Sequence, residues 1–295
     1  MSLYSIADLE KLSGVKAHTI RIWEQRYALL TPLRSATNIR YYDDAELRKL
    51  LRISTLINNG FRISEISKLS EEQINQELDR LIETSQAGSE MVFIHQLIDA
   101  GINYDESGFK KVFNSCLKKH GIISAYIKVI YPMLERIGML WTKEDIVPAQ
   151  EHFISNLIRQ KLFTAIDGLP LPKDPAATYV LFLPEEEEHE IGLLIAAYLL
   201  RRKGIQVIYL GQRVPLANLM LTVSSCQATH IMSFFVHRQK NSEAQKYINM
   251  LSSEFDDLKI IIAGNAWLMS QLHIPENILW ISSVKQFEDH LVSYA

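Results

Sequence analysis

The 295-residue sequence lacks any apolar run of the roughly 18 residues that a membrane-spanning helix needs. Nothing at its start resembles a signal peptide, because Asp8 and Glu10 interrupt the first apolar stretch. Its two cysteines, Cys116 and Cys226, are far apart and form no CxxC pair, which argues against a disulfide framework and a cysteine zinc site. These absences predict a cytoplasmic protein with no membrane contact. The length is enough for two or three domains.

Charge is distributed unevenly along the chain. The formal net charge is −3, yet residues 1–70 carry more Lys and Arg than Asp and Glu, whereas the rest of the chain is acidic. A basic module at one end of an otherwise acidic chain is typical of a local contact with nucleic acid.

The first 27 residues predict two helices joined by a tight turn. Ser5 and Asp8 have the spacing of a capped helix start, and Ser13-Gly14-Val15 forms a turn before a second helix over residues 17–27. Helix, tight turn, helix is the geometry that places a second helix in the major groove of DNA.

Basic side chains accompany this geometry. Arg21 of the second helix can reach a base edge or a phosphate. Residues 31–38 are rich in turn formers and residues 39–42 predict a short strand, so Arg34 and Arg40 flank a hairpin wing suited to phosphate contacts. The expected DNA-contacting residues are Lys16, His18, Thr19, Arg21, Arg26, Arg34, Arg40 and Tyr41.

The next segment continues in short helices. A third helix is expected from Asp43-Asp44 to about Asn58 and is closed by Gly60, and a short helix is expected to begin at Ser64. Residues 73–89 read as a brief polar helix followed by a linker, without a sustained heptad.

Residues 4–70 resemble the winged-helix domain of the MerR family of transcription regulators. The matching segments are Tyr4-Ser5-Ile6, Thr19 to Glu24, and Arg40-Tyr41-Tyr42. The resemblance implies a DNA-binding domain over residues 1–72 that recognises double-stranded operator DNA as a homo-oligomer, a dimer or a tetramer. MerR proteins usually dimerise through a long coiled coil. Because no heptad is present, the contact between protomers is expected in the C-terminal domains.

Residues 90–168 have the pattern of a four-helix bundle, with a kink near Pro132 and Pro148 in a first turn. Nine residues separate Trp141 from Glu151 and His152, which lie on a predicted helix. The three side chains could line one face of a cavity, or Trp141 could end the bundle core while the other two lie on the helix surface.

Residues 169–177 are proline-rich and read as a linker to an α/β domain over residues 176–295. Short apolar runs alternate there with helical patterns, which predicts a doubly wound parallel sheet. The loops after Pro184, Gly211, Val236 and Gly264 are expected at one edge, where ligands bind in such sheets.

His189 lies on the first of these loops, within the run EEEEHEIG. Its ring can offer a nitrogen to a metal or cofactor. The competing interpretation is a solvated loop residue beside an acidic run.

The bundle followed by this α/β domain resembles the cobalamin-binding module, and the run Glu187-x-His189-x-x-Gly192 matches its ligand loop. The resemblance implies His189 as the lower axial ligand of cobalt, oriented by Glu187, with Gly192 allowing close approach of the nucleotide tail. The Trp-x9-Glu-His spacing is similar to light-sensing CarH-type regulators, whose corresponding residues cover the adenosyl face. The implied cofactor-binding residues are Trp141, Glu151, His152, Glu187, His189, Gly192, Ser233 and Gly264.

Three positions depart from that pattern. The family's Ser-x-Leu is replaced by Ser233-Phe234-Phe235, which predicts a bulky Phe235 beside the tail. Its Gly-Gly is replaced by Gly264-Asn265, and a histidine that follows the tryptophan in some members is replaced by Thr142.

Together these observations predict a non-enzymatic transcription regulator, most simply a repressor. It would be assembled on operator DNA by adenosylcobalamin and disassembled by light. Two alternatives stay open. One is a regulator of the same fold that senses a protein partner, such as an antirepressor, or another ligand. The other is a corrinoid carrier subunit, against which the DNA-binding head argues.

Overall fold

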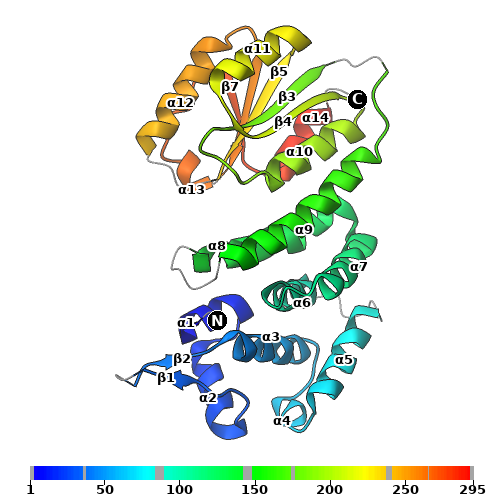
Figure 1. The fold of residues 1–295 in the computed structure, drawn as a ribbon, viewed down its shortest axis with the longest axis vertical. Helices are drawn as coiled ribbons and strands as arrows, with labels where there is room; N and C mark the ends of the chain where they lie inside the picture. Colours follow the sequence, from blue (N-terminus) through cyan, green and yellow to red (C-terminus); the bar gives the residue numbers. More distant parts are fainter. Residues whose placement is uncertain are drawn as a thin grey trace. The chain divides into compact units, whose positions relative to one another are not determined.

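The computed structural model (Figure 1) describes residues 3–35, 38–83, 90–141, 148–173, 177–236, 241–264 and 266–292. Within these ranges it describes every side chain except those of residues 82–83 and 139–141. The chain divides into two compact units, residues 1–157 and 158–295. Among the described helices, none combines the length and the apolar character that crossing a membrane requires.

The first unit begins with the predicted helix-turn-helix. The hydroxyl of Ser5 accepts the N–H of Asp8, and the Asp8 carboxylate accepts the N–H of Ser5, so both residues cap α1 (Ile6–Ser13). Gly14 ends this helix at φ 73°, the left-handed conformation that glycine adopts most readily. The second helix, α2 (Ala17–Tyr27), follows at once.

A small wing and a third helix complete the head. Strands β1 (Leu33–Arg34) and β2 (Arg40–Tyr41) pair antiparallel, as the arginine-flanked hairpin predicted. Asp43 caps α3 (Asp44–Asn58) by accepting the N–H of Glu46, and the chain leaves this helix through Gly60 at φ 94°.

The next helix begins earlier than its sequence indicated. We expected Ser64 to start it, whereas α4 (Ile63–Ile66) is preceded by Arg62. The N–H of Arg62 is accepted by the carboxylate of Glu65, so the acidic side chain of the first turn satisfies this end of the helix.

Helix α5 (Glu71–Glu83) occupies most of residues 73–89, the segment predicted to be a linker. The brief helix expected there is thus longer and better packed than its polar composition suggested. Two of its apolar side chains, Ile74 and Leu78, are buried, and they lie four residues apart on one helix face. Lys111 of the bundle pairs with Asp79 of α5 at 2.8 Å.

The bundle contains the four expected helices, α6 (Glu90–Ile102), α7 (Glu106–Ala125), α8 (Tyr131–Trp141) and α9 (Pro148–Asp167). Gly121 interrupts α7 with φ 71°, a non-helical conformation. The predicted kink takes the form of a π-helical turn, η1 (Tyr126–Ile130), immediately before Tyr131 and Pro132. Proline has no N–H to donate, which favours such a local change of hydrogen bonding.

The head packs against the bundle, and this contact was not predicted. The hydroxyl of Thr55 on α3 lies 3.1 Å from Nδ1 of His95 on α6. The guanidinium of Arg52 pairs with Asp99 at 3.0 Å. Head and bundle therefore belong to one unit, and the division between units falls inside α9 rather than at the expected domain boundaries.

The second unit is the predicted α/β domain. Its elements are β3 (Thr178–Pro184), α10 (Ile191–Arg202), β4 (Gln206–Val214), α11 (Leu216–Cys226), β5 (His230–Phe235), α12 (Asn241–Glu254), β6 (Lys259–Gly264), α13 (Ala266–Met269), β7 (Ile278–Ile281) and α14 (Val284–Leu291). Strand β4 runs three residues past Gly211, where a loop was expected, and α13 was not predicted.

The five strands are parallel and stand in the order β4-β3-β5-β6-β7. The chain crosses to the other side of β3 between β4 and β5, which makes β3 and β5 the switch point of a doubly wound sheet. Ligands of such sheets bind outside the carboxyl ends of the strands at this point.

Helices cover both faces of the sheet (Figure 1). One face carries α11, α12 and α13, and its core includes Phe182, Ile231, Phe235 and Ile262. The opposite face carries α10 and α14. Neighbouring residues of β5 therefore point to different layers, because side chains alternate along a strand.

Candidate functional site

Helix α2 presents the polar face that DNA recognition needs. Ile20 and Trp23 are buried against the head, whereas His18, Arg21 and Arg26 are exposed and Thr19 is partly exposed. Burying one face fixes the helix, and the opposite face is left for a base edge or a phosphate.

Two predicted DNA contacts have partners within the head. Lys16, before α2, pairs with Glu10 at 3.0 Å. Arg40 donates from Nε to Glu24 at 3.1 Å, and the hydroxyl of Tyr42 donates to the same carboxylate at 3.1 Å. Burial, together with the Glu24 charge, raises the pKa of Tyr42 to about 12. Arg40 thus ties the wing to the recognition helix.

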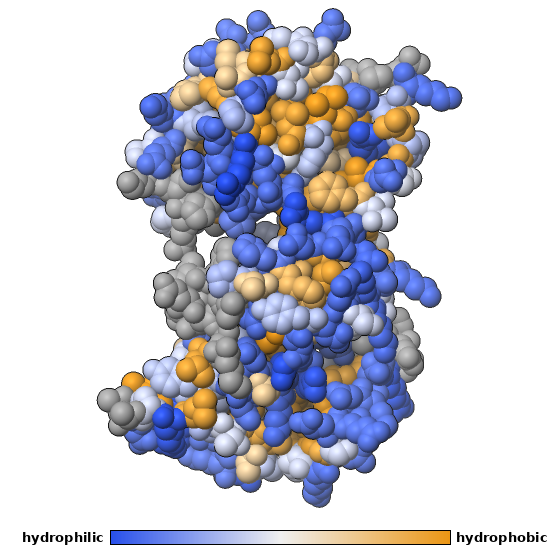
Figure 2. Space-filling view, in the orientation of Figure 1, coloured by the Kyte–Doolittle hydropathy of each residue, from blue (hydrophilic) through white to orange (hydrophobic). Residues whose placement is uncertain are grey.

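The tip of the wing is more open. Arg34 is exposed and donates to the side chain of Asn38 at 2.6 Å. Tyr41 is partly exposed. The same hairpin exposes two apolar side chains, Leu33 and Ile39, and hydrophobic surface is visible on this part of the head (Figure 2). Among the described residues of the wing, Arg34 is therefore an exposed arginine with apolar neighbours.

In the second unit, the loop after β3 folds around one buried carboxylate. Glu187 has a side chain only 2% exposed. Its Oε1 accepts the backbone N–H groups of Glu188 and His189, both at 3.0 Å, and its Oε2 accepts the N–H of Val236 at 2.8 Å. Val236 follows β5, so this carboxylate joins the two strands of the switch point.

The same carboxylate orients His189. Nδ1 of the ring lies 2.6 Å from Oε1 of Glu187. Because an ionised carboxylate only accepts hydrogen bonds, Nδ1 carries the proton and Nε2 is the nitrogen with which this ring would bind a metal. The His189 side chain is 39% exposed, so the imidazole stands at the surface of the crevice.

A second buried carboxylate braces the loop, and sequence reasoning missed it. Glu190 is 3% exposed and pairs with Arg159 of α9. It also accepts the hydroxyl of Tyr209 at 2.7 Å and the side-chain amide of Gln212 at 3.2 Å. Burial and the hydrogen bond to Glu190 raise the pKa of Tyr209 strongly, so its hydroxyl stays a donor. These three partners offset the free-energy cost of burying the Glu190 carboxylate.

The end of β4 supports the loop from its other side. Gln212 donates to the backbone oxygen of Glu188 at 2.6 Å, and Arg213 pairs with the Glu188 carboxylate. Gly211 and Arg213 both have positive φ, 77° and 55°, so the strand is distorted where it meets the loop. The extension of β4 past the expected loop therefore serves the His189 loop.

Gly192 and Gly264 both lie where a side chain would collide. A Cβ at Gly192 would stand 2.8 Å from Cε1 of Phe234. A Cβ at Gly264, whose φ is 151°, would overlap the backbone oxygen of Phe235. The backbone of the neighbouring strand β5 requires a glycine at position 264. The Phe234 ring requires a glycine at position 192.

Phe235, which we expected beside the nucleotide tail, is part of the hydrophobic core. Phe235 is 2% exposed and lies in the core under α12, where its ring contacts Tyr247. Strand alternation places Ser233 on that same face, opposite to Gly192. The Ser233 hydroxyl is buried and has no hydrogen-bond partner among the described residues. Phe234, partly exposed, is the residue that fills the Gly192 side.

The remaining predicted residues lie on the bundle. Trp141 is the last residue of α8, and its side chain lies outside what the structure describes, as do Thr142 and Asn265. Glu151 and His152 are in the first turns of α9, with Nδ1 of His152 at 3.1 Å from Glu151. The His152 side chain is 60% exposed.

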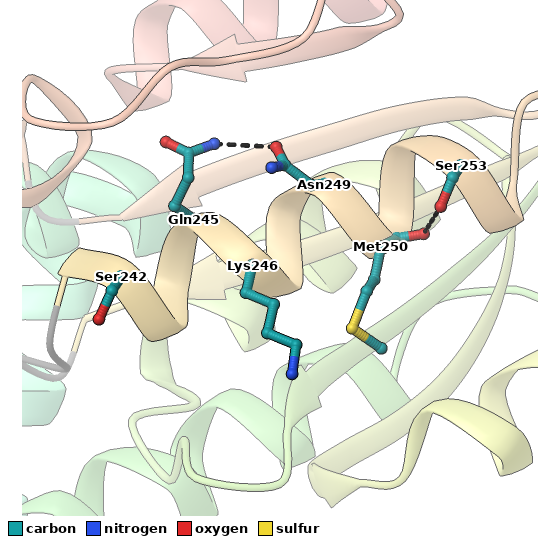
Figure 3. Close-up of a pocket in the computed structure, with 6 residues that line it drawn as sticks. All are labelled: Ser242, Gln245, Lys246, Asn249, Met250 and Ser253. Atoms are coloured by element: carbon teal, nitrogen blue, oxygen red, sulfur yellow. Dashed lines mark hydrogen bonds between the residues drawn. The ribbon is translucent and has the colours of Figure 1, made fainter.

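Polar side chains also line a shallow depression along the outward face of α12 (Figure 3), formed by Ser242, Gln245, Lys246, Asn249, Met250 and Ser253. Gln245 donates to Asn249 along the helix at 2.9 Å. The depression holds none of the predicted site residues, and we assign it no function.

Comparison with known proteins places these features in a family. Residues 4–73 match the model described as MerR HTH family regulatory protein, and residues 93–165 match the one described as B12 binding domain. The HTH-type transcriptional repressor CarH of Myxococcus xanthus is 32% identical over 221 residues, which cover 73% of this chain and 73% of CarH. The chain belongs to the CarH family of MerR-type transcriptional repressors.

A further member of this family is similar over the same extent. The HTH-type transcriptional repressor CarA of Myxococcus xanthus is 31% identical over 226 residues, covering 72% of this chain and 70% of CarA. The solved structure of the Methanosarcina barkeri monomethylamine corrinoid protein aligns with a TM-score of 0.52 and 15% identity, over 68% of this chain and 96% of that chain. It shares the fold. As a member of the CarH family, this chain is a DNA-binding transcription regulator and not an enzyme, as predicted.

The residues at the switch point fit a corrinoid on its metal side. The Glu187 carboxylate orients His189 through Nδ1, so Nε2 could offer a nitrogen to the cobalt of a corrinoid. The Ser233 hydroxyl of β5 is buried and has no hydrogen-bond partner among the described residues, so it is a polar group that a ligand could satisfy. The crevice on the Gly192 side, in contrast, is filled by Phe234.

Proposed function

We propose that this chain represses transcription by binding operator DNA as an oligomer that adenosylcobalamin assembles and light disassembles. The observation that carries the proposal is the buried Glu187, which holds His189 with Nδ1 protonated. A lone surface histidine would not require a carboxylate with three further backbone donors.

In this proposal the second unit holds the cobalt side of the cofactor. Nε2 of His189 would bind the cobalt, Glu187 would fix the tautomer of the ring, and Glu190 with its partners keeps the loop in place. Gly192 would border the nucleotide tail. The assignment of Ser233 and Gly264 to the tail stays a prediction, because Ser233 lies on the sheet face opposite to Gly192. When bound, adenosylcobalamin supplies a cobalt–carbon bond that visible light cleaves.

The upper face is assigned to the bundle. Trp141, Glu151 and His152 would cover the adenosyl group, an assignment supported by family membership and by their Trp-x9-Glu-His spacing. The exposed ring of His152 leaves it accessible for such a contact. Thr142 stands where some members have a histidine, so no second histidine follows Trp141 directly to bind cobalt after illumination.

Operator binding would follow assembly through avidity. Several heads on one DNA bind far more tightly than one head, because each later contact is intramolecular. Within each head, Arg21 and Arg26 of α2 and Arg34 of the wing are exposed cations that would contact DNA. A dimer or a tetramer both satisfy this requirement.

The proposal is tested by measuring mass and operator binding of protein loaded with adenosylcobalamin, in the dark and after green light. We expect a larger, DNA-binding oligomer in the dark and smaller, weakly binding species after illumination. An oligomer that stays the same size and keeps its operator affinity after illumination would contradict it. The His189→Ala variant is the matched control for loading.

One observation favours a second candidate. The Phe234 ring beside Gly192 is a native barrier to a cofactor tail. A regulator whose crevice stays closed would sense a protein partner, such as an antirepressor, through the same α/β domain. Failure of any corrinoid to bind, together with tight operator binding by the unloaded protein, would favour this candidate.

A further inference from the structure

The Phe234 ring occupies space that the protein backbone would otherwise leave open. A Cβ placed on Gly192 would lie 2.8 Å from Cε1 and 2.9 Å from Cδ1 of this ring, closer than carbon atoms approach in proteins. Ring and glycine therefore pack against each other directly. Both residues are partly exposed, whereas the next residue, Phe235, is buried in the core.

This contact lies at the switch-point crevice. Gly192 is three residues after His189, in the first turn of α10. Phe234 is two residues before Val236, whose N–H is bound by Glu187. The ring thus extends from β5 toward the first turn of α10, which follows the loop of His189. Doubly wound sheets accept ligands at this end of their strands.

A histidine-ligated cobalamin makes a demand on this place. In free cobalamin the base of the nucleotide tail occupies the lower position on cobalt. If Nε2 of His189 takes that position, the displaced base and its nucleotide need a slot beside the loop. The Gly192 side, where a side chain is missing, offers one, and the Phe234 ring already fills it.

We propose that Phe234 is a specificity gate, which must swing away from Gly192 before a corrinoid with a nucleotide tail binds. A corrinoid without a tail binds His189 with the gate closed. This inference rests on the proposed function, since it takes His189 as the cobalt ligand. The nucleotide tail is the part of the cofactor against which Phe234 discriminates.

The packing itself is testable without any cofactor. Gly192→Ala inserts a methyl group against the ring, so it should lower Tm in the native background. Combined with Phe234→Ala, the same methyl group has room, and alanine is the better helix former, so Tm should not fall. Equal effects of Gly192→Ala in both backgrounds would show that the ring does not pack there and would overturn the gate.

The binding test uses adenosylcobalamin and adenosylcobinamide, which lacks the nucleotide tail, each titrated in the dark and followed by its visible spectrum. Phe234→Ala and the milder Phe234→Leu should tighten cobalamin binding about tenfold, the size of one displaced aromatic contact. Cobinamide binding should change less than about twofold. Trp280→Ala, a partly buried aromatic of β7, controls for a general loss of stability.

The outcomes of these titrations distinguish the Phe234 gate from the proposed function. Selective tightening of cobalamin binding supports the gate. Cobinamide bound through His189, with both corrinoids affected equally by Phe234→Ala, overturns the gate and leaves the proposed function standing. Neither corrinoid bound by the native chain or by either Phe234 variant overturns the proposed function and the gate with it.

Discussion

Two Glu–His pairs in this molecule have the same chemistry and opposite surroundings. In the His189 loop, the Glu187 side chain is 2% exposed and stands 2.6 Å from Nδ1 of the histidine. On α9, the Glu151 side chain is 17% exposed, His152 is 60% exposed, and the two lie 3.1 Å apart.

The difference lies in what else holds the carboxylate. Glu187 accepts three backbone N–H groups from two segments, so its position is fixed before any ligand arrives. Glu151 and His152 are neighbours on a helix with solvent around the imidazole. The first pair is preorganised for one ligand geometry, whereas the second pair is held by fewer described hydrogen bonds.

The largest expected effect comes from removing each histidine in turn. His189→Ala deletes the axial nitrogen, so adenosylcobalamin affinity should fall at least about 100-fold, beyond the range seen for outer partners of metal ligands. His152→Ala should change it far less, because its ring is mostly exposed. Spectral titration of both variants measures this. Equal losses of adenosylcobalamin affinity in the two variants would contradict the distinction between the two Glu–His pairs.

The two carboxylates should differ next, in stability. Glu187→Gln replaces an oxygen that accepts backbone N–H groups with an amide that donates, and should lower the free energy of unfolding by about 1–3 kcal/mol. Glu151→Gln should stay within about 0.5 kcal/mol, as partly exposed surface changes do. Urea unfolding of the unloaded protein checks both. A costly Glu151→Gln would mean that this pair is also structural.

His95 is a third histidine to compare. It is buried, and its described side-chain partner is the hydroxyl of Thr55 rather than a carboxylate. Burial, with the nearby charge of Arg136, lowers the pKa of His95 to about 3. The unfolded chain binds the proton near pH 6.5, so stability should be full above that pH and fall by at least about 1 kcal/mol as pH drops toward 3.

The matched variant for this acid effect is His95→Phe. Its unfolding free energy should depend less on pH between 6.5 and 3 than that of the native chain. An unchanged pH profile would assign the acid sensitivity to other groups. Because His95 contacts Thr55 of the head, the native chain should also lose operator affinity in acid.

The smallest effect is expected at the brace of the His189 loop. Tyr209→Phe removes one of the partners of buried Glu190 and should cost about 1 kcal/mol of stability. Cobalamin affinity should fall only a few-fold, because Arg159 and Gln212 still hold the carboxylate. Loss of binding as large as in His189→Ala would make Tyr209 part of the ligand site itself.

Local sequence patterns predicted the helices and strands, and the contacts between residues that are close in sequence. The Ser5 cap, the Gly14 turn and the alternation of short strands and helices depend on residues close in sequence, so they were visible in advance. The Glu187–His189 pair was also predictable, because both residues lie within one short loop.

Contacts between distant segments were not predictable. Arg159, Tyr209 and Gln212 meet at Glu190 from α9 and β4, and no local pattern joins them. The contact between Phe234 and Gly192 was not predicted for the same reason. Strand alternation separates the rings of Phe234 and Phe235, but only the packing of α10 decides which face borders the crevice.

The most direct test of the account is the visible spectrum of protein mixed with adenosylcobalamin in the dark and freed of unbound cofactor, alongside His189→Ala. The account predicts bound cobalamin in the native chain, a spectral change under green light, and loss of that bound form in the variant. A colourless native protein, or a bound spectrum unchanged by His189→Ala, would contradict the role of His189 as the cobalt ligand.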